Sequence, residues 1–345
     1  MLSLQQQIER TQKSKKEKTI GQIVKSKEFQ PANVRAPPAT RMRRTLKGHF
    51  GKVTALHWGG DSRTLVSASQ DGNLLIWNAV TSNKVQAISL KSSYVMSVGM
   101  EQSKMNLVAC GGLDNLCTVY NRSNPAKAVE MASHDGFLSC CRFLSEQEML
   151  TSSGDSTCIH WDITKALPIN TFAEHTADAM FLSIRPTDSH VFVSCSVDKT
   201  AKVWDTRAPG KSVQSFGGHH LGDINGVEFL SDGNAFATCS QDNTVRLFDL
   251  RAYNELNRFG TPVVPNMAAA ENEGFTSLVV SRSGRLIFCG HSDGSIYAYD
   301  VLSDKGTPSF TMAGAHERQV SCVGVSPQGN ALCTGSWDTT LKIWA

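Results

Sequence analysis

The sequence predicts an all-β protein built from seven repeated sheets in a ring, with an α-helix at its N-terminus. Three observations predict this fold. An aspartate precedes an aromatic residue by six positions in seven places, short alternating runs of apolar and polar residues lie between these pairs, and residues 1–30 have a helix-favouring composition. With 345 residues, 40% of them hydrophobic and 19% charged, the chain is composed like a globular protein but is longer than one ordinary layered domain.

The repeated pair of aspartate and aromatic residue carries the fold prediction. The pairs are Asp71/Trp77, Asp114/Tyr120, Asp155/Trp161, Asp198/Trp204, Asp242/Phe248, Asp293/Tyr299 and Asp338/Trp344. The aromatic residues recur at intervals of 41 to 51 residues, and each repeat holds strand-length runs such as VTALHW, TLVSAS and NLLIW between turn residues. Three or four such runs fit in each repeat. The pattern resembles the WD40 family, and this resemblance implies a seven-bladed β-propeller over residues 43–345, with four-stranded blades packed around a channel.

Histidines and serines accompany most of these aspartates. Five histidines precede their aspartate by 21 to 23 residues, namely His49, His134, His175, His220 and His316. Five serines lie two residues before it, at Ser69, Ser153, Ser196, Ser240 and Ser336. The resemblance to WD40 proteins implies a hydrogen-bonded network of Asp, His, Ser and Trp inside each blade. A catalytic triad is a single site with an exposed nucleophile, whereas this trio recurs, so we interpret it as structural and expect no catalytic residue.

The remaining motifs give no sign of catalysis or of a bound cofactor. No His, Asp or Glu cluster has metal-ligand spacing, no C-x-x-C pair occurs, and no Gly-rich phosphate loop opens a helix. The ten cysteines are expected to be reduced thiols, mostly buried in strands. We also expect no membrane span, no signal peptide and no prenyl anchor. The sequence therefore predicts a protein that is not an enzyme and binds neither metal nor cofactor.

Comparison of the seven repeats with one another also predicts how the ring closes and which two repeats are irregular. The seventh repeat ends at LKIW without an outer strand, which RRTLKGH at residues 43–49 is expected to supply. In the second repeat, Ser92 and Ser93 stand where a histidine is expected, so its network should be incomplete. The sixth repeat is enlarged by residues 260–274 and is expected to contain no histidine. That segment reads equally well as a functional loop or as a tolerated insertion.

The N-terminal segment differs from the body in charge and composition. Residues 1–47 hold 12 basic and 3 acidic side chains. Residues 1–30 favour a helix, and a proline-containing linker at 31–42 follows it. Four apolar residues form a sparse coiled-coil seam, namely Leu4, Ile8, Ile20 and Ile23, with a polar gap in its middle. Two interpretations stay open, a solvated basic helix and a helix that pairs with a partner helix.

Several short sequence segments, beyond the repeated pattern itself, resemble one branch of the WD40 family. RRTLKGH, HWGGDSRTLVSASQDG, SSYVMS, VACGGLDN, LSCCRFL, RLFDLRA and TGSWD are similar, in order, to the beta subunits of heterotrimeric G proteins. The resemblance implies that the helix pairs with a small gamma subunit that carries the lipid anchor. It also implies that one ring face binds the GDP-bound alpha subunit and, after its release, effectors of receptor signalling. The expected location is cytoplasmic, peripheral at the inner face of the plasma membrane.

The resemblance also implies which residues form that face. The matching positions are Lys52, Leu75, Lys84, Ser93, Tyr94, Met96, Leu113, Asn115, Asp178, Met180, Asp223 and Trp337. Exposed aromatic and apolar side chains at loops would anchor a partner, and the charged residues would form a rim. The chain departs from the family pattern at one of these positions, Tyr94, and also at Thr54, Asn73, Asp135, Phe137 and Gln241. Lost rim charges should change partner preference more than fold.

Two other functions are compatible with parts of the sequence. Another WD40 scaffold or adaptor would share the ring but not the SSYVMS and CGGLDN words. Nucleic-acid binding would use the basic N-terminal segment and would weaken steeply with salt. That segment lacks interleaved aromatic residues, since Phe29 is the single one in residues 1–30, so we expect no nucleic-acid partner.

Overall fold

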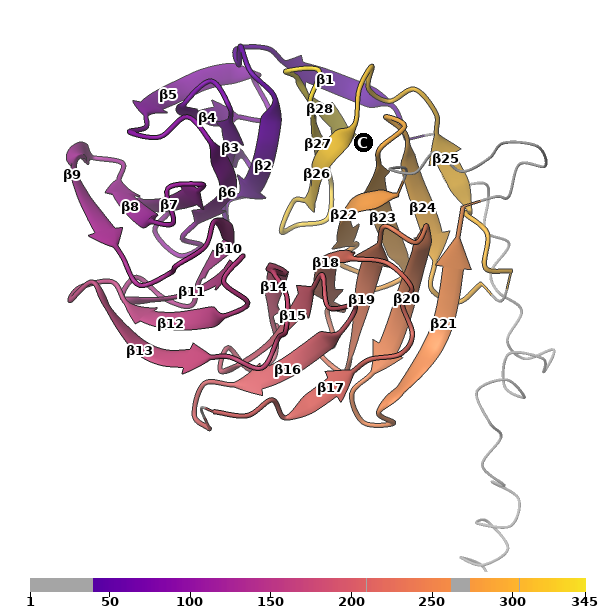
Figure 1. The fold of residues 1–345 in the computed structure, drawn as a ribbon. Coiled ribbons are helices and arrows are strands. Elements are labelled where there is room, and N and C mark those ends of the chain that lie inside the picture. The colour runs from indigo at the N-terminus through magenta and orange to yellow at the C-terminus, as the bar shows by residue number, and fades with distance from the viewer. Residues whose placement is uncertain (1–39, 209, 262–273, 304) are drawn as a thin grey trace, which may run out of the picture. The chain divides into compact units, whose positions relative to one another are not determined.

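The computed structural model describes residues 40–208, 210–261, 274–303 and 305–345. Within these residues the fold is all-β, with seven four-stranded antiparallel sheets (Figure 1). The predicted fold class is therefore confirmed for the body of the chain. The predicted helix at 1–30 and most of the linker and of the 260–274 segment lie outside the described residues, and so do Leu4, Ile8, Ile20 and Ile23.

We number the sheets as blades one to seven in chain order. The strands of blades one to three are β2 (Val53–Trp58), β3 (Thr64–Ser69), β4 (Asn73–Asn78), β5 (Asn83–Ser89), β6 (Val95–Met100), β7 (Leu107–Gly112), β8 (Cys117–Asn121), β9 (Asn124–Met131), β10 (Leu138–Phe143), β11 (Glu148–Ser153), β12 (Cys158–Asp162) and β13 (Leu167–Phe172). The strands of blades four and five are β14 (Ala179–Ile184), β15 (Val191–Ser196), β16 (Ala201–Asp205), β17 (Gln214–Phe216), β18 (Ile224–Phe229), β19 (Ala235–Ser240), β20 (Thr244–Asp249) and β21 (Asn254–Gly260). Those of blades six and seven are β22 (Phe275–Val280), β23 (Leu286–His291), β24 (Ile296–Asp300), β25 (Phe310–Met312), β26 (Val320–Val325), β27 (Leu332–Ser336), β28 (Leu341–Trp344) and β1 (Met42–Leu46).

The chain closes the ring by joining its first strand to its last. The outermost strand of blade seven is β1, which pairs antiparallel with β28 through Met42 opposite Trp344 and Leu46 opposite Leu341. Met42, the last residue of the expected linker, is thus the first residue of a strand. The first strand of each blade is the innermost, and these seven strands contact one another in sequence, with β26 next to β2 (Figure 1). Closure leaves no gap between the first and last sheets.

Burial explains why these short runs form sheets. In β4, Leu74, Leu75, Ile76 and Trp77 are all buried, because a central strand packs on a neighbouring blade through both faces. Clusters of buried apolar side chains fill the spaces between successive blades, including blades seven and one, where Leu46 is buried. Burying this apolar surface is the main favourable term of folding.

Side chains near the start of the inner strands also join neighbouring blades. Thr276 in blade six donates to the carbonyl of Val320 in blade seven, and Ser321 in blade seven donates to that of Val53 in blade one. Ser139 and Asn225 make the same kind of bond to the following blade. These bonds satisfy backbone carbonyls that face the central channel, where no further strand is available to pair with them.

The turn between the second and third strands has the same backbone in every blade. The residue after the repeat aspartate has a positive φ in all seven, at Gly72, Asn115, Ser156, Lys199, Asn243, Gly294 and Thr339. The aspartate carboxylate accepts the N–H of the residue two positions later, as Asp338 does from Thr340. A short acidic side chain suits this turn because it satisfies a backbone donor that the tight bend leaves without a strand partner.

Candidate protein interface

The network inside blade one shows what the repeated polar residues do. His49 Nδ1 lies 2.9 Å from Asp71 Oδ2, and His49 Nε2 lies 2.7 Å from Ser67 Oγ. Trp77 Nε1 donates to the same Ser67 oxygen at 2.8 Å. Ser67 is fully buried, so its hydroxyl is inaccessible to any substrate. The arrangement connects the turn to the sheet core and is structural.

Four other blades repeat this network. The histidine–aspartate distances are 2.7 Å for His134/Asp155, 2.8 Å for His175/Asp198, 3.1 Å for His220/Asp242 and 2.8 Å for His316/Asp338. The hydroxyl partners of these histidines are Thr151, Ser194, Thr238 and Thr334. In blade five, Phe248 replaces the tryptophan, so that the hydroxyl of Thr238 lacks an indole donor.

The predicted serine of the network is wrong. The hydroxyl that contacts the histidine comes four residues before the aspartate, as at Ser67, and not two residues before it, as at Ser69. The hydroxyl of Ser69 instead accepts the backbone N–H of Asp71 at 3.3 Å. Ser69 is the last residue of β3, at the turn, whereas Ser67 lies within the sheet opposite Leu75, where it can reach both aromatic rings.

The charge states of the network follow from burial and pairing. Burial alone would raise the pKa of Asp155, but the hydrogen bonds from His134 and Thr157 outweigh it and hold that pKa well below its ordinary value. Burial lowers the pKa of His49 and His220, against the opposing effect of their aspartate partners. The aspartate is therefore the anionic member, and the histidine links it to the buried hydroxyl.

Blades two and six depart from the pattern. Asp114 of blade two is exposed and has no histidine partner, and its carboxylate accepts only the N–H of Leu116, at 3.4 Å. Blade six does contain a histidine, His291, so the expectation that it has none is wrong. Its Nδ1 lies 3.1 Å from Asp293, and its Nε2 lies 2.9 Å from Asn243 Oδ1 of blade five. His291 lies in β23 rather than in a preceding loop, which is why the repeat spacing missed it.

One end of the ring carries most of the residues expected to bind a partner. At this end, the loop that leads into each inner strand meets the turn between the second and third strands of the same blade. The carbonyls of Lys52, Tyr94, Asp178, Asp223 and Gln319 accept turn N–H groups at Gln70, Leu113, Val197, Gln241 and Trp337. We call this surface the loop face. Because strands alternate in direction, all of these segments lie at the same end of their sheets.

Exposed apolar side chains stand on the loop face. Tyr94 and Leu113 are 58% and 54% exposed and come from adjacent segments, since Leu113 N donates to the Tyr94 carbonyl at 3.0 Å. Ser93 is exposed beside them, and Asn115 is half-buried in the same turn as Leu113. Exposed apolar groups gathered in this way are typical of a protein-binding surface.

Two exposed residues of the loop face were not among those predicted from the sequence. Phe50 is 91% exposed and Leu221 is 76% exposed. Each directly follows a network histidine, and its backbone N–H donates to the network aspartate, at 2.9 Å for Phe50 and 2.8 Å for Leu221. Because the backbone is held there, the side chain must point outward. A large apolar residue directly after the histidine is the signal that would have found both.

Two expected contact residues do not belong to the loop face. Leu75 is 3% exposed and packs in the core between blades one and seven, so its side chain offers no surface to a partner. Lys84 is exposed but lies on the outer strand β5, opposite Trp77 and next to the turn at the other end of the sheet. The assumption that all twelve residues share one face is therefore wrong for this pair.

Two methionines line the mouth of the channel. Met96 and Met180 are the second residues of the inner strands β6 and β14, and both are half-buried. They line a cavity of about 150 Å³ at the ring axis, together with residues from all seven inner strands. Their flexible apolar side chains continue the apolar part of the loop face inward.

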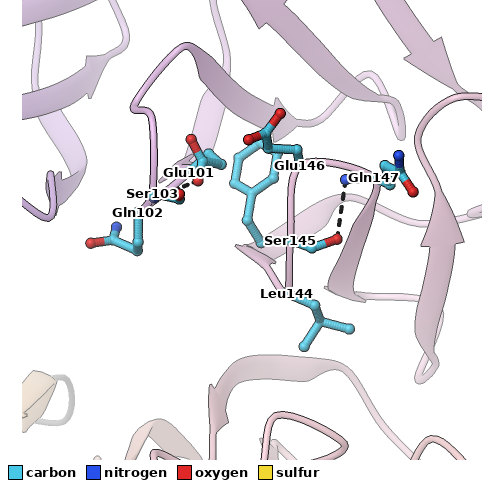
Figure 2. A pocket seen from close by; sticks show the side chains of 8 residues that line it. Glu101, Gln102, Ser103, Leu144, Ser145, Glu146 and Gln147 are labelled. Carbon is cyan, nitrogen blue, oxygen red and sulfur yellow. Dashed lines mark hydrogen bonds between the residues drawn. The ribbon is translucent and has the colours of Figure 1, made fainter.

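The other end of the ring holds a wide pocket between blades two and three (Figure 2). Its volume is about 560 Å³, and its lining includes Phe143, Leu144 and Glu146. Glu101 also lines it and is 2% exposed, but its carboxylate accepts the backbone N–H groups of Ser103, Lys104 and Met105. This carboxylate therefore stabilises a turn and is not a general acid or base.

The described residues contain no group of three His, Cys, Asp or Glu side chains able to hold a metal ion. These residues also form no helix that is long and apolar enough to cross a membrane. All ten cysteines are free and buried, and burial raises the pKa of Cys110 and Cys195 well above the ordinary thiol value. Both thiols therefore stay protonated and unreactive at neutral pH.

Comparison with known proteins agrees with this geometry. The family model for G protein beta WD-40 repeat proteins matches residues 2–345. Three similar proteins are guanine nucleotide-binding protein subunit beta-2 of Nicotiana tabacum and the beta subunits of Oryza sativa subsp. japonica and Arabidopsis thaliana, at 42%, 42% and 41% identity. Each alignment covers 88% of this chain and 82% of the relative. Proteins of this family are propeller scaffolds of signal transduction and not enzymes. The chain belongs to the G protein beta family of WD40-repeat proteins.

Proposed function

We propose that this protein is the beta subunit of a heterotrimeric G protein, which binds a GDP-bound alpha subunit on its loop face and a gamma subunit through residues 1–30. The observation that carries the proposal is the set of exposed apolar side chains on the loop face, above all Phe50, Tyr94 and Leu113. Rigid aromatic groups at a preformed surface are the usual anchors of protein interfaces.

Charged side chains around these anchors support a protein partner. Lys52, Asp178 and Asp223 are half-buried and come from loops of blades one, four and five. A mixed rim of this kind governs association rate and partner choice more than total affinity. The departures at Asn73 and Gln241 remove a cation and an anion relative to the family pattern, so we expect a narrower or different set of effectors.

The proposed mechanism is exclusion by equilibrium binding. The GDP-bound alpha subunit covers the loop face and thereby hides it from effectors. When nucleotide exchange rearranges the alpha subunit, its affinity for the loop face falls and effectors gain access. A network of buried polar bonds in five blades favours a rigid ring, so the beta subunit itself does not need to change conformation.

We also propose a location at the inner face of the plasma membrane. In this proposal the lipid anchor belongs to the gamma subunit, and membrane attachment of the beta subunit is indirect. The excess of basic residues in 1–47 would add attraction to anionic lipids, at about 1 kcal/mol for each cation that reaches the surface. Fractionation of cells with and without the gamma subunit tests this, since loss of gamma should move the protein from membranes to the soluble fraction.

The deciding experiment for alpha binding is a pull-down with alpha subunits in the GDP-bound and activated forms. The GDP-bound form should bind and the activated form should not. Leu113→Ala should reduce binding, whereas Leu167→Ala, at a 58% exposed leucine of the outer strand β13, is the matched control and should not. Binding that ignores the nucleotide state would favour the alternative, another WD40 scaffold or adaptor protein.

Gamma pairing is tested by co-expression. Full-length protein with candidate gamma chains should give more soluble complex than protein lacking residues 1–30. Equal yields of the two forms would contradict a gamma-binding role for this segment.

A further inference from the structure

The central channel contains a polar layer that the proposed function does not use. The fifth residues of the seven inner strands lie at one level of the ring and are His57, Gly99, Arg142, Ser183, Glu228, Val279 and Gly324. The polar ones all come from blades one, three, four and five. His57, Arg142, Ser183 and Glu228 line one chamber of about 280 Å³, whose remaining walls are mostly apolar. A chamber with a few polar groups and apolar walls is typical of a small-ligand site.

Arg142 supplies a fixed positive charge in this chamber. Its Nη1 donates to the carbonyls of Val98 and Cys141 at 3.2 and 2.8 Å, and its guanidinium carbon lies 5.0 Å from the ring centroid of Phe181. These contacts hold the guanidinium against the channel wall. Within the described residues, its Nε and Nη2 make no hydrogen bond and it forms no ion pair. Arg142 lines the chamber, and its Nε and Nη2 groups stay available to donate to a bound ligand.

His57 and Ser183 add neutral donors. The Nδ1 atom of His57 accepts the backbone N–H of Met100 at 2.9 Å, so its proton lies on Nε2. Burial, with a smaller effect from Arg142, lowers the pKa of His57 and keeps the ring neutral. Ser183 Oγ accepts the backbone N–H of Phe229 at 3.2 Å, which leaves its hydroxyl hydrogen free to donate.

Glu228 is the one carboxylate that lines this chamber. One of its oxygens, Oε2, accepts the backbone N–H of Val280 at 3.1 Å, and the other has no hydrogen-bond partner among the described residues. A ligand with several acceptor oxygens and one O–H group would satisfy all these groups together. Its oxygens would accept from Arg142 and the neutral donors, and its O–H would donate to Glu228.

We propose that this chamber binds a small oxyanion that carries an O–H group, with hydrogen phosphate or a small hydroxyl-bearing phosphomonoester as the chemical class, and that Glu228 selects it over sulfate. Sulfate carries no proton at neutral pH, so it would face the Glu228 carboxylate with an unprotonated oxygen. A buried contact between two acceptor oxygens, with no proton between them, is strongly unfavourable. The charge of Arg142 supplies attraction, and Glu228 supplies the discrimination.

The test is isothermal titration calorimetry of the full chain in buffer free of phosphate and sulfate. The pH is 8, where the Glu228 carboxyl group is mostly ionised, because burial raises its pKa only to about 7. Inorganic phosphate should bind saturably at one site per chain, and sulfate should bind at least about tenfold more weakly. Glycerol phosphate is the second probe. Tighter binding than inorganic phosphate assigns a phosphomonoester, and weaker binding assigns the free ion.

Three variants connect the binding to the chamber. Arg142→Gln should weaken phosphate binding by about tenfold or more. Glu228→Gln should reduce the preference for phosphate over sulfate, because an amide N–H can donate to sulfate while the amide oxygen still accepts from Val280. The control is Arg251→Gln, at an exposed arginine on the turn between β20 and β21, and it should change nothing.

Two results would overturn the proposal. One is the absence of saturable phosphate binding at millimolar concentration, and the other is equal affinity of the unaltered protein for phosphate and sulfate. If Arg142→Gln fails to fold, two other measurements test whether the anion binds in this chamber. They are the anion preference of Glu228→Gln and the phosphate affinity of Arg142→Lys. Unchanged preference and unchanged affinity in those two variants would place any bound anion elsewhere on the protein.

Discussion

The Nζ atom of Lys52 lies 3.7 Å from the centroid of the Trp337 ring. Lys52 belongs to the loop that leads into blade one, and Trp337 belongs to a turn of blade seven, so this cation–π contact crosses the junction at which the ring closes. An ammonium group over an indole ring is worth about 0.5–1 kcal/mol at an exposed site. The contact holds the two side chains together on the loop face.

Trp337→Ala should weaken binding of a GDP-bound alpha subunit by about 2 kcal/mol or more if the indole is an interface anchor. The melting temperature should change little, because Trp337 lies at a turn and outside the apolar core clusters. Surface plasmon resonance and thermal melts of the same samples separate these effects. A large fall in melting temperature with unchanged binding would mean that the indole is structural.

Lys52 and Trp337 should be coupled in stability. In a double-mutant cycle with Lys52→Met and Trp337→Leu, the coupling in the free energy of unfolding should be about 0.5–1 kcal/mol. Denaturant titration of the four proteins gives this value. Additive effects would show that the contact contributes nothing.

Asp155→Ala should lower the free energy of unfolding by about 1–3 kcal/mol, because it leaves buried His134 without its partner. Asp114→Ala is the matched control, since Asp114 occupies the same turn position without a histidine. Its cost should be clearly smaller. Equal destabilisation by the two changes would contradict a special role for the network.

Leu46→Ala should destabilise the entire ring by about 2–5 kcal/mol. Leu46 is buried in β1, the strand that joins the two ends of the propeller. Unfolding followed by circular dichroism and by tryptophan fluorescence should shift together, because opening this junction exposes blades one and seven at once. The exposed Leu302→Ala is the control and should leave both transitions in place.

Glu228→Gln should stabilise the protein more at pH 8 than at pH 5. Burial raises the pKa of Glu228 from an ordinary 4.5 to about 7, so the folded state holds this proton more tightly than the unfolded state. The resulting stability is complete below pH 4.5 and is lost as the pH rises through 7. Gln remains neutral at both values and avoids that loss.

Thermal melts in phosphate-free buffer measure this difference. The melting temperature of Glu228→Gln relative to the unaltered protein should rise from pH 5 to pH 8. Glu317→Gln, at an exposed glutamate, should show the same relative melting temperature at both pH values. A constant offset for Glu228→Gln as well would show that its carboxyl group titrates normally.

The local parts of the fold were predictable because they repeat at fixed offsets. Asp155 and its counterparts could be found in the sequence because each lies six residues before an aromatic residue. The histidines recur at a nearly constant separation from these aspartates, and the resemblance to WD40 proteins implied that the two residues pair. The network hydroxyl was assigned to Ser69 instead of Ser67 because the two serines lie two residues apart and face the same side of β3. The position along the strand decides which of them reaches the histidine.

The sequence by itself determined the number of blades, the turn aspartates, the segment that closes the ring and the family resemblance. Each of these depends on residues at short, fixed separations or on short segments that resemble the family. Only the tertiary structure showed that Leu75 is buried, that Lys84 lies away from the loop face, and that Phe50 points outward. It alone placed Arg142 and Glu228 in one chamber. Blades far apart in the sequence meet around a common axis. Whether a side chain there is buried or exposed therefore depends on the closed ring and not on any single repeat.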